Sequence, residues 1–139
     1  MILRDDFKSS LETIHAALDL FSQIPAKRRM VVLGEVSEPP GSQGPIYREI
    51  GERIASIASH AIFIGGNFQR YAAGVRRGGL PSSSMMDAER SVLKAIGLLR
   101  EDLRFGDVVL IKGRDTQRLG PITLALIGRK VCCDIDFCN

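Results

Sequence analysis

The sequence predicts an α/β protein with three layers, in which a mostly parallel sheet carries helices on both faces. Two observations lead to this prediction. Short runs made up wholly of apolar residues recur along the chain, and such runs are typical of parallel strands covered on both faces. Segments with apolar residues three and four positions apart, the spacing of an amphipathic helix, alternate with these runs. With a length of 139 residues, this alternation predicts one domain over residues 1–139.

The predicted strands are the apolar runs of the chain. Four of them are well defined, at residues 1–4, 30–33, 61–64 and 108–111. Glycines follow the three inner runs closely, which favours a turn directly after each strand. Residues 131–137 are predicted to add an edge strand, and residues 78–84 hold either a minimal strand near Leu80 or only loop.

The predicted helices lie between these strands. The first begins with a capping box, in which the Ser9 side chain accepts from the N–H of Glu12 and Glu12 reaches back, and Pro25 ends it. The second has Pro45 in its first turn, and the others cover about residues 68–75, 87–100 and 121–127. The residues expected on the buried faces of the first, second and fourth helices are Leu11, Ile14, Leu18 and Phe21, then Ile46, Ile50, Ile54 and Ile57, and then Val92, Leu93, Ile96 and Leu99.

Composition and charge exclude several classes of protein. Nineteen Lys and Arg against sixteen Asp and Glu give a net charge of +3, and aromatic residues make up 6% of the chain. Because the basic runs 27–29 and 76–77 are short and separate, we expect solvated basic faces and no nucleic-acid partner. No apolar run approaches the length of a membrane span and no signal peptide is visible, so we expect a cytoplasmic protein without a membrane partner. The three cysteines favour neither a disulfide framework nor a zinc site, and are expected to be buried or incidental thiols: Cys132, Cys133 and Cys138.

Motifs for common catalytic chemistry are missing from the sequence. There is no G-x-x-x-x-G-K-[ST] phosphate loop, no G-x-G-x-x-G dinucleotide motif and no G-x-S-x-G elbow. His15 lies within a predicted helix and His60 at the end of another, so both are expected to be structural or exposed. We therefore expect no catalytic residue, no metal site and no means of binding a triphosphate with magnesium in this chain by itself.

Polar residues follow the predicted strands at the positions where α/β proteins bind ligands. In an open parallel sheet, ligands lie outside the carboxyl ends of the strands. Here these ends carry Asp5-Asp6, Gly34-Glu35, Gly65-Gly66-Asn67 and residues 112–115. A Gly- and Pro-rich loop at residues 35–45 follows the second of them, and its length is typical of functional loops.

Three segments of the chain resemble three landmark motifs of one protein family, in the same order and at the same separations. Residues 4–14, RDDFKSSLETI, resemble a DDSYNANPDSM-like turn into a helix. VLGEVSEPP at residues 32–40, with YREIG at 47–51, resembles VLGDMLELG followed by HxExG. GDVVLIKGRDTQRLG at residues 106–120 resembles GDVVLVKGSRxxxLE. The sequence therefore resembles the C-terminal domain of the Mur ligases over nearly its whole length, nearest to the branch that adds D-alanyl-D-alanine to the UDP-N-acetylmuramoyl tripeptide.

This resemblance implies a Rossmann-like domain of an ATP-dependent, amide-forming ligase. In such ligases a central domain holds ATP and magnesium and makes an acyl phosphate, while the C-terminal domain closes over the nucleotide and positions the amine substrate. Nucleotide contacts are implied for Asp5, Lys8 and Ser10. Contacts to substrate are implied for a larger set at the strand ends and in the following loops: Glu35, Glu38, Tyr47, Lys112, Gly113, Arg114 and Asp115. The expected partners are an amino acid or short peptide and, through N-terminal and central domains that residues 1–139 lack, ATP or ADP.

Several residues depart from the family pattern. The asparagines of the first turn are Lys8 and Ser10, the histidine of the second landmark is Tyr47, the Ser-Arg pair of the third is Arg114-Asp115, and its closing acid is Gly120. These departures motivate a second hypothesis, a stand-alone binding or interaction module on the same fold. Under the first hypothesis the chain is one domain of a larger ligase and catalyses nothing alone, in keeping with a first residue that lies almost at the first strand.

A receiver domain of a two-component system is a third hypothesis. Asp5-Asp6 and Lys112 stand at strand ends, as the acidic pair and the lysine of a receiver do. However, Gly65-Gly66 stand where a receiver needs its acceptor aspartate, and Gly113 stands where receivers usually carry proline.

Overall fold

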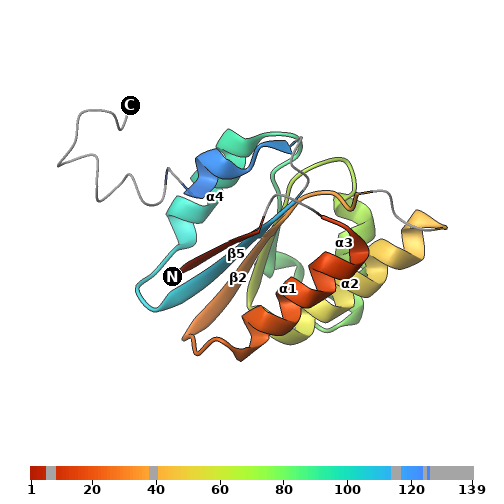
Figure 1. Ribbon diagram of the computed structural model, residues 1–139, viewed down its shortest axis with the longest axis horizontal. Helices are drawn as coiled ribbons and strands as arrows, with labels where there is room; N and C mark the ends of the chain where they lie inside the picture. Colours follow the sequence, from red (N-terminus) through yellow and green to blue (C-terminus); the bar gives the residue numbers. More distant parts are fainter. Residues whose placement is uncertain (6–8, 38–40, 114–116, 124, 126–139) are drawn as a thin grey trace.

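Five parallel strands form one sheet in the part of the chain that the structure describes: residues 1–5, 9–37, 41–113, 117–123 and 125 of a computed structural model (Figure 1). The order in the sheet is β1-β5-β2-β3-β4, and every pair of neighbours is parallel. The strands are β1 (Ile2–Asp5), β2 (Arg28–Leu33), β3 (His60–Phe63), β4 (Met85–Asp87) and β5 (Asp107–Lys112). The helices are α1 (Leu11–Gln23), α2 (Gln43–Ile57), α3 (Phe68–Arg77) and α4 (Val92–Asp102), with a 3₁₀ turn, η1 (Ser82–Ser84), before β4.

Helices cover both faces of the sheet. On one face lie α1, α2 and α3, and on the other lie α4 and the helical residues 120–123. The run in β2 is apolar throughout because Val31 and Leu33 are buried in the first core, whereas Met30 and Val32 are buried in the second. The predicted class, an α/β protein with a parallel sheet between two helical layers, is confirmed.

The start of α1 differs from the prediction by one residue. Ser10 rather than Ser9 is the N-cap, since its side-chain oxygen accepts a hydrogen bond from the N–H of Thr13 at 3.2 Å. Ser9 is fully buried, and its carbonyl oxygen accepts from the N–H of Ser37 at 2.7 Å. The predicted capping box from Ser9 to Glu12 is wrong because the loop after β2 holds the Ser9 backbone and the next serine caps the helix.

A strand that the sequence did not reveal lies between α3 and α4. β4 has only three residues, too few to show a period of two, and it pairs with β3. The helix predicted from residue 87 therefore begins at Val92, after a turn in which Glu89 has a positive φ of 56°. The prediction for Leu93 is also wrong, since it is 80% exposed. The fully packed face of α4 is formed by Ala95, Ile96 and Leu99.

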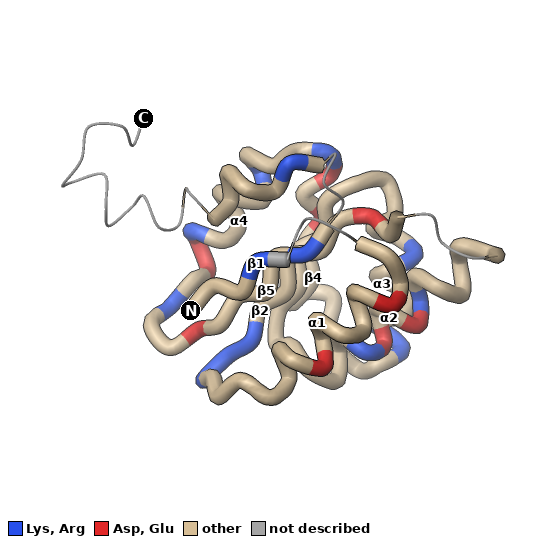
Figure 2. The backbone as a smooth tube through the Cα atoms, in the orientation of Figure 1, with Lys and Arg blue, Asp and Glu red and all other residues tan. Residues whose placement is uncertain are grey.

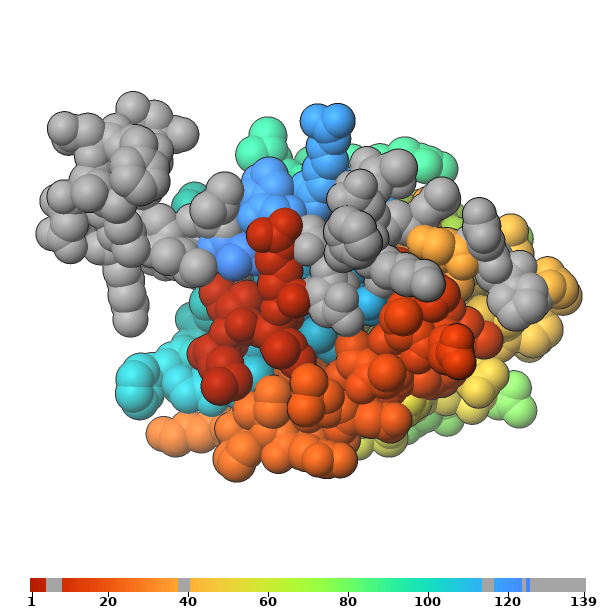
Figure 3. Space-filling model, in the orientation of Figure 1, coloured from red at the N-terminus to blue at the C-terminus, as the bar shows by residue number. Residues whose placement is uncertain are grey.

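The end of the chain is described only in part. Residues 120–123 and 125 are helical, which agrees with the start of the predicted last helix. The predicted edge strand 131–137 and the three cysteines lie outside the described residues. In the space-filling view the N-terminal residues lie beside residues 117–123 (Figure 3). This contact includes Arg4, whose guanidinium lies 2.9 Å from the position that a Cβ on Gly120 would take.

α2 and α3 pack against each other through glycines. A Cβ at Gly74 would lie 1.9 Å from the carbonyl oxygen of Arg48, and one at Gly51 would lie 2.3 Å from that of Tyr71. Real side chains never approach backbone so closely, so both positions require glycine at this helix spacing. The contact fixes the place of α3, whose first turn lies at the carboxyl edge of the sheet.

An ion-pair cluster lies at the amino edge of the sheet. Arg28 Nε and Nη2 donate to the two carboxylate oxygens of Asp107 at 3.0 and 2.7 Å. The N–H of Arg104 also donates to Asp107. The hydrogen bond from Arg28, supported by that N–H, lowers the pKa of Asp107 although burial opposes this. Arg28 is therefore half-buried and paired rather than solvated as expected for the run 27–29.

The remaining polar groups on the fold surface are mixed in sign. Acidic and basic residues alternate around the fold instead of gathering on one face (Figure 2).

Both histidines have structural contacts: His15 Nδ1 lies 2.8 Å from Arg53 Nη1, and His60 Nε2 lies 3.6 Å from Asp102 Oδ2. Among the described residues, no helix is long and apolar enough to span a membrane.

Candidate functional site

The carboxyl ends of the strands bring several predicted site residues to one edge. The sheet register places Asp5 of β1 and Leu33 of β2 on either side of Lys112 of β5. Glu35 follows β2 directly. Three of the predicted nucleotide and substrate residues, Asp5, Glu35 and Lys112, therefore lie along the β1-β5-β2 part of this edge.

Lys112 and Gly113 form the centre of the edge. Lys112 is only 1% exposed, so it lies beneath the surface of the site, and its carbonyl oxygen accepts from the N–H of Gly34 at 2.8 Å. A Cβ on Gly113 would lie 2.5 Å from Leu119 Cδ1 and 3.4 Å from the Cα of Gly34. A side chain at 113 would therefore displace the Leu119 side chain, which packs against this glycine.

Gln117 is a site residue that the sequence analysis missed. Its side-chain oxygen accepts from the N–H of Glu35 at 2.9 Å, and its side-chain nitrogen donates to the carbonyl oxygen of Ile64 at 3.1 Å. One side chain thereby ties the segment after β5 to the exits of β2 and β3. No local pattern marks this glutamine, because both its partners are backbone groups distant in sequence.

Two buried tyrosines hold the loop after β2. Tyr47 is 2% exposed, and its hydroxyl oxygen accepts from the N–H of Val36 at 3.1 Å and from Asn67 Nδ2 at 3.2 Å. The hydroxyl of Tyr71 donates to the carbonyl oxygen of Gly34 at 2.6 Å, and the two rings are 4.7 Å apart. Burial, aided by Tyr47 and the Glu35 carboxylate, raises the pKa of Tyr71 well above its usual value. Tyr71 is therefore a neutral donor here, and contact of Tyr47 with a substrate stays a prediction.

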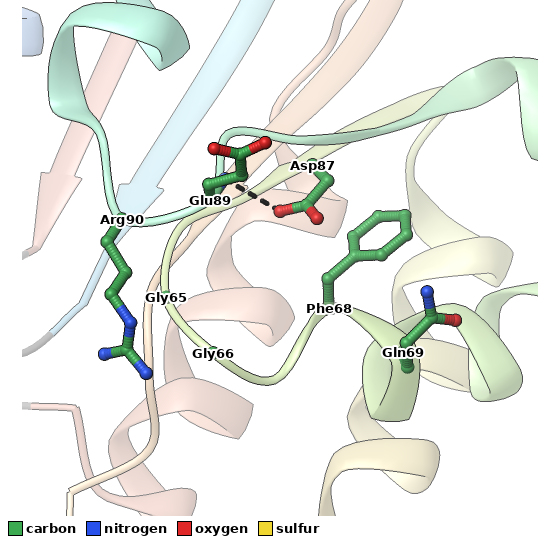
Figure 4. A pocket seen from close by; sticks show the side chains of 7 residues that line it. All are labelled: Gly65, Gly66, Phe68, Gln69, Asp87, Glu89 and Arg90. Carbon is green, nitrogen blue, oxygen red and sulfur yellow. Dashed lines mark hydrogen bonds between the residues drawn. The ribbon is translucent and has the colours of Figure 1, made fainter.

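A cavity opens beside this loop, at the exits of β3 and β4 (Figure 4). Its volume is about 360 Å³. The residues that line it are Gly65, Gly66, Phe68, Gln69, Asp87, Glu89 and Arg90. Glu35 lies next to them: its Oε1 accepts from the N–H of Gly66 at 3.0 Å and is 4.0 Å from Arg90 Nη1.

The other predicted site residues are placed in part. The side chain of Ser10 is used as the cap of α1, at the same edge of the sheet. The backbone of Asp5 is described as the last residue of β1, whereas Lys8, Glu38 and Arg114-Asp115 lie outside the described residues. Within the described ranges, no group of three or more His, Cys, Asp or Glu residues has an arrangement that fits a metal ion.

The fold described above matches part of two ligases of known structure. A MurF ligase from Thermotoga maritima, crystallised in complex with ADP, superposes on 88% of this chain with a TM-score of 0.67 and 18% sequence identity. MurF from Acinetobacter baumannii superposes on 90% of it with a TM-score of 0.72 and 17% identity. The matched regions are 27% and 28% of those two proteins. These likenesses define the class of fold as that of a ligase domain.

Sequence comparison places the chain within a family. The family model for the Mur ligase, glutamate ligase domain, matches residues 1–114, and the chain belongs to this family. It is similar to the UDP-N-acetylmuramoyl-tripeptide–D-alanyl-D-alanine ligase of Synechocystis sp., with 28% identity over 131 residues. That match covers 91% of this chain but 27% of the relative, so the chain spans about a quarter of the relative's length. The predicted family and its branch are confirmed, and the family replaces the receiver hypothesis.

Proposed function

We propose that this chain is the domain of a Mur-type ligase that closes over a nucleotide held by other domains and positions the amine substrate. By analogy with the Synechocystis relative, the reaction joins D-alanyl-D-alanine, or a related amino acid or short peptide, to a UDP-N-acetylmuramoyl peptide. An amide then forms between the amine and a carboxylate activated as an acyl phosphate. The domain contributes proximity, since an amine held beside the acyl group loses little further entropy on attack.

One observation carries this proposal: the family's third landmark, GDVVLIKG, forms β5 and ends at the centre of the carboxyl edge. It brings Lys112, Gly113 and Glu35 together there, where α/β domains bind ligands. The tyrosines and Gln117 fix the surrounding loop before any ligand arrives. Such preorganisation lowers the entropy that binding must overcome.

ATP and magnesium are proposed to bind mainly outside this chain. The described residues offer no magnesium ligand cluster, and the sequence has no phosphate loop. Asp5, Lys8 and Ser10 are proposed to meet the nucleotide from this side when the domains close. In support, a MurF ligase of the same fold was crystallised in complex with ADP. The chain alone is then expected to release no phosphate from ATP.

The test has two steps. First, an immunoblot of the source cells with an antibody against this domain gives the size of the native protein. A band several times larger than this chain supports the ligase proposal, whereas a band at the size of the chain itself supports a stand-alone binding module. Second, phosphate release from ATP by the larger protein is measured with UDP-N-acetylmuramoyl tripeptide, with and without D-alanyl-D-alanine or other amines. If none of these amines increases the release of phosphate, the proposed function is wrong.

A further inference from the structure

The cavity at the exits of β3 and β4 carries charges of both signs on opposite sides of a glycine floor. Figure 4 shows Arg90 on one side of Gly65 and Gly66, with Asp87 and Phe68 on the other. None of these residues belongs to the landmarks that mark the family in this sequence. We propose that this cavity binds the amine substrate as a zwitterion, with its carboxylate on Arg90 and its ammonium on Asp87. The proposal rests on the proposed function, because it assigns the amine substrate of that ligase to a particular place.

Arg90 is available for a carboxylate. Its side chain is 79% exposed, and its ion pair with Glu35 is a long one at 4.0 Å. Glu35 Oε1 is already an acceptor for the N–H of Gly66 at 3.0 Å. A guanidinium presents five donors in a planar fork that matches a carboxylate, so an incoming carboxylate forms shorter and better aligned bonds than Glu35 does.

Asp87 lies on the other side of the cavity. The N–H of Glu89 donates to Asp87 Oδ1 at 2.7 Å, which orients the carboxylate. The side chain of Glu89 is itself paired with Lys94 Nζ at 3.2 Å. Among the described residues, Asp87 is therefore the carboxylate of the cavity that forms no ion pair with a Lys or Arg side chain. An ammonium group can form such an ion pair with it.

The backbone of the cavity is fixed by contacts between its two loops. The N–H of Gly65 donates to the carbonyl oxygen of Glu89 at 2.6 Å. Glu89 holds a positive φ of 56°, a conformation that costs free energy for a residue with a side chain and that clusters at ligand sites. This bond joins the β3 exit to the β4 exit, so the glycines lie beside the loop that carries Asp87 and Arg90.

Size and wall chemistry favour a small amino acid or dipeptide. A volume of about 360 Å³ lies at the lower end of the range of small-molecule pockets. The Phe68 ring offers an apolar wall for methyl groups, and the glycines let the ligand approach the backbone. Gly66 has a further role, since a Cβ there would lie 2.6 Å from Arg90 Nη2 and would displace the guanidinium.

Amide NMR of this chain tests the proposal with three probes. These are D-alanyl-D-alanine, its N-acetyl derivative, which lacks the ammonium, and its C-terminal amide, which lacks the carboxylate. We expect D-alanyl-D-alanine to shift the amide signals of Gly65, Gly66 and Glu89 most. Each blocked derivative should bind about tenfold more weakly or worse, the loss expected for one hydrogen-bonded charge.

Variants separate the role of Arg90 from general effects of charge and folding. Arg90→Gln and Gly66→Ala should each raise the Kd for the dipeptide about tenfold, and should leave the Kd of the C-terminal amide unchanged. The matched controls are Arg77→Gln, at the far end of α3, and Gly44→Ala, where a Cβ meets nothing within 4 Å. Both controls should bind like the parent chain.

Failure of the cavity proposal and failure of the proposed function give different results. Shifts confined to Gly113 and Gln117, no shift with any of the probes, or parent-like binding by Arg90→Gln overturn the cavity proposal and leave the ligase proposal standing. If instead the dipeptide binds at Gly65 and Gly66 but the larger protein shows no amine-stimulated phosphate release, the cavity stands as a zwitterion site and the ligase function is wrong.

Discussion

The close contact between α2 and α3 leads to a sharp prediction for Gly74→Ala. The new Cβ would lie 1.9 Å from the carbonyl oxygen of Arg48 and 2.7 Å from its carbonyl carbon. Ordinary van der Waals contact begins at 3.4 Å, so the helices must part by about 1.5 Å, the difference between 3.4 and 1.9 Å. Because both partners are backbone, no side-chain rotation relieves the overlap.

Two terms of opposite sign set the magnitude. Alanine is the better helix former by about 1 kcal/mol, which favours the variant. Overpacking a core costs about 1–3 kcal/mol and more where backbone must move, and here the movement also loosens the buried Tyr71 and Val75 against α2. We therefore expect a net destabilisation of about 2 kcal/mol or more.

The assay is urea unfolding of the chain, followed by far-UV circular dichroism because the sequence has no tryptophan. Gly97→Ala is the matched control: Gly97 is exposed in α4, and a Cβ there meets nothing within 4 Å. This control should stabilise the protein by about 0.5–1 kcal/mol through helix propensity alone. Equal shifts of the urea midpoint for the two variants, or a raised midpoint for Gly74→Ala, would refute the packing argument.

Three further predictions concern hydrogen bonds and charge. Arg28 lowers the pKa of Asp107 in the folded state, so stability should fall as the pH drops below the ordinary pKa of 3.8 and through the folded value. In a series of urea midpoints measured against pH, Asp107→Asn should reduce this loss of stability in acid. An unchanged loss contradicts the assignment. Tyr71→Phe leaves the carbonyl oxygen of Gly34 without its donor and should cost about 1–3 kcal/mol in the same unfolding assay, whereas a loss near zero would mean that water replaces the hydroxyl. Ser10→Ala should cost about 1 kcal/mol through the lost cap, and a cost below a few tenths would argue against Ser10 as the N-cap.

The sheet was predictable where burial alone decides the pattern. Runs such as Val108–Ile111 are apolar on both faces because a helical layer covers each side, and this signal is local. β4 was not predictable, because three residues with Asp87 at the end carry no period and only pairing with β3 defines them. Ser9 shows a related limit, because a shift of one residue in the start of α1 changes which serine is the cap. Leu93 belongs to the apolar set predicted for the buried face of α4 but lies on its exposed face.

The candidate site was predictable only in its landmarks. Lys112 and Gly113 stand out because they follow an apolar run, but the nearly complete burial of Lys112 depends on the loops above it. Gln117 contacts backbone groups 53 and 82 residues away, and Arg90 lies against Glu35 of another loop, so no spacing in the sequence marks either residue. The family pattern predicts Tyr47 as a site residue, and the structure adds that its hydroxyl oxygen accepts hydrogen bonds from the N–H of Val36 and from Asn67.

The strand order has a consequence for how the chain folds during synthesis. β5, near the end of the described chain, lies between β1 and β2, the first two strands to be made. Until residue 112 has left the ribosome, β1 has no neighbour in the sheet and the inner edge of β2 is open. A nascent chain therefore exposes an unpaired strand edge until almost the whole domain has been translated, and unpaired edges promote association between chains. Closure of the sheet by its last strand makes folding late and long-range, and it makes the ligand edge, centred on the end of β5, one of the last parts to form.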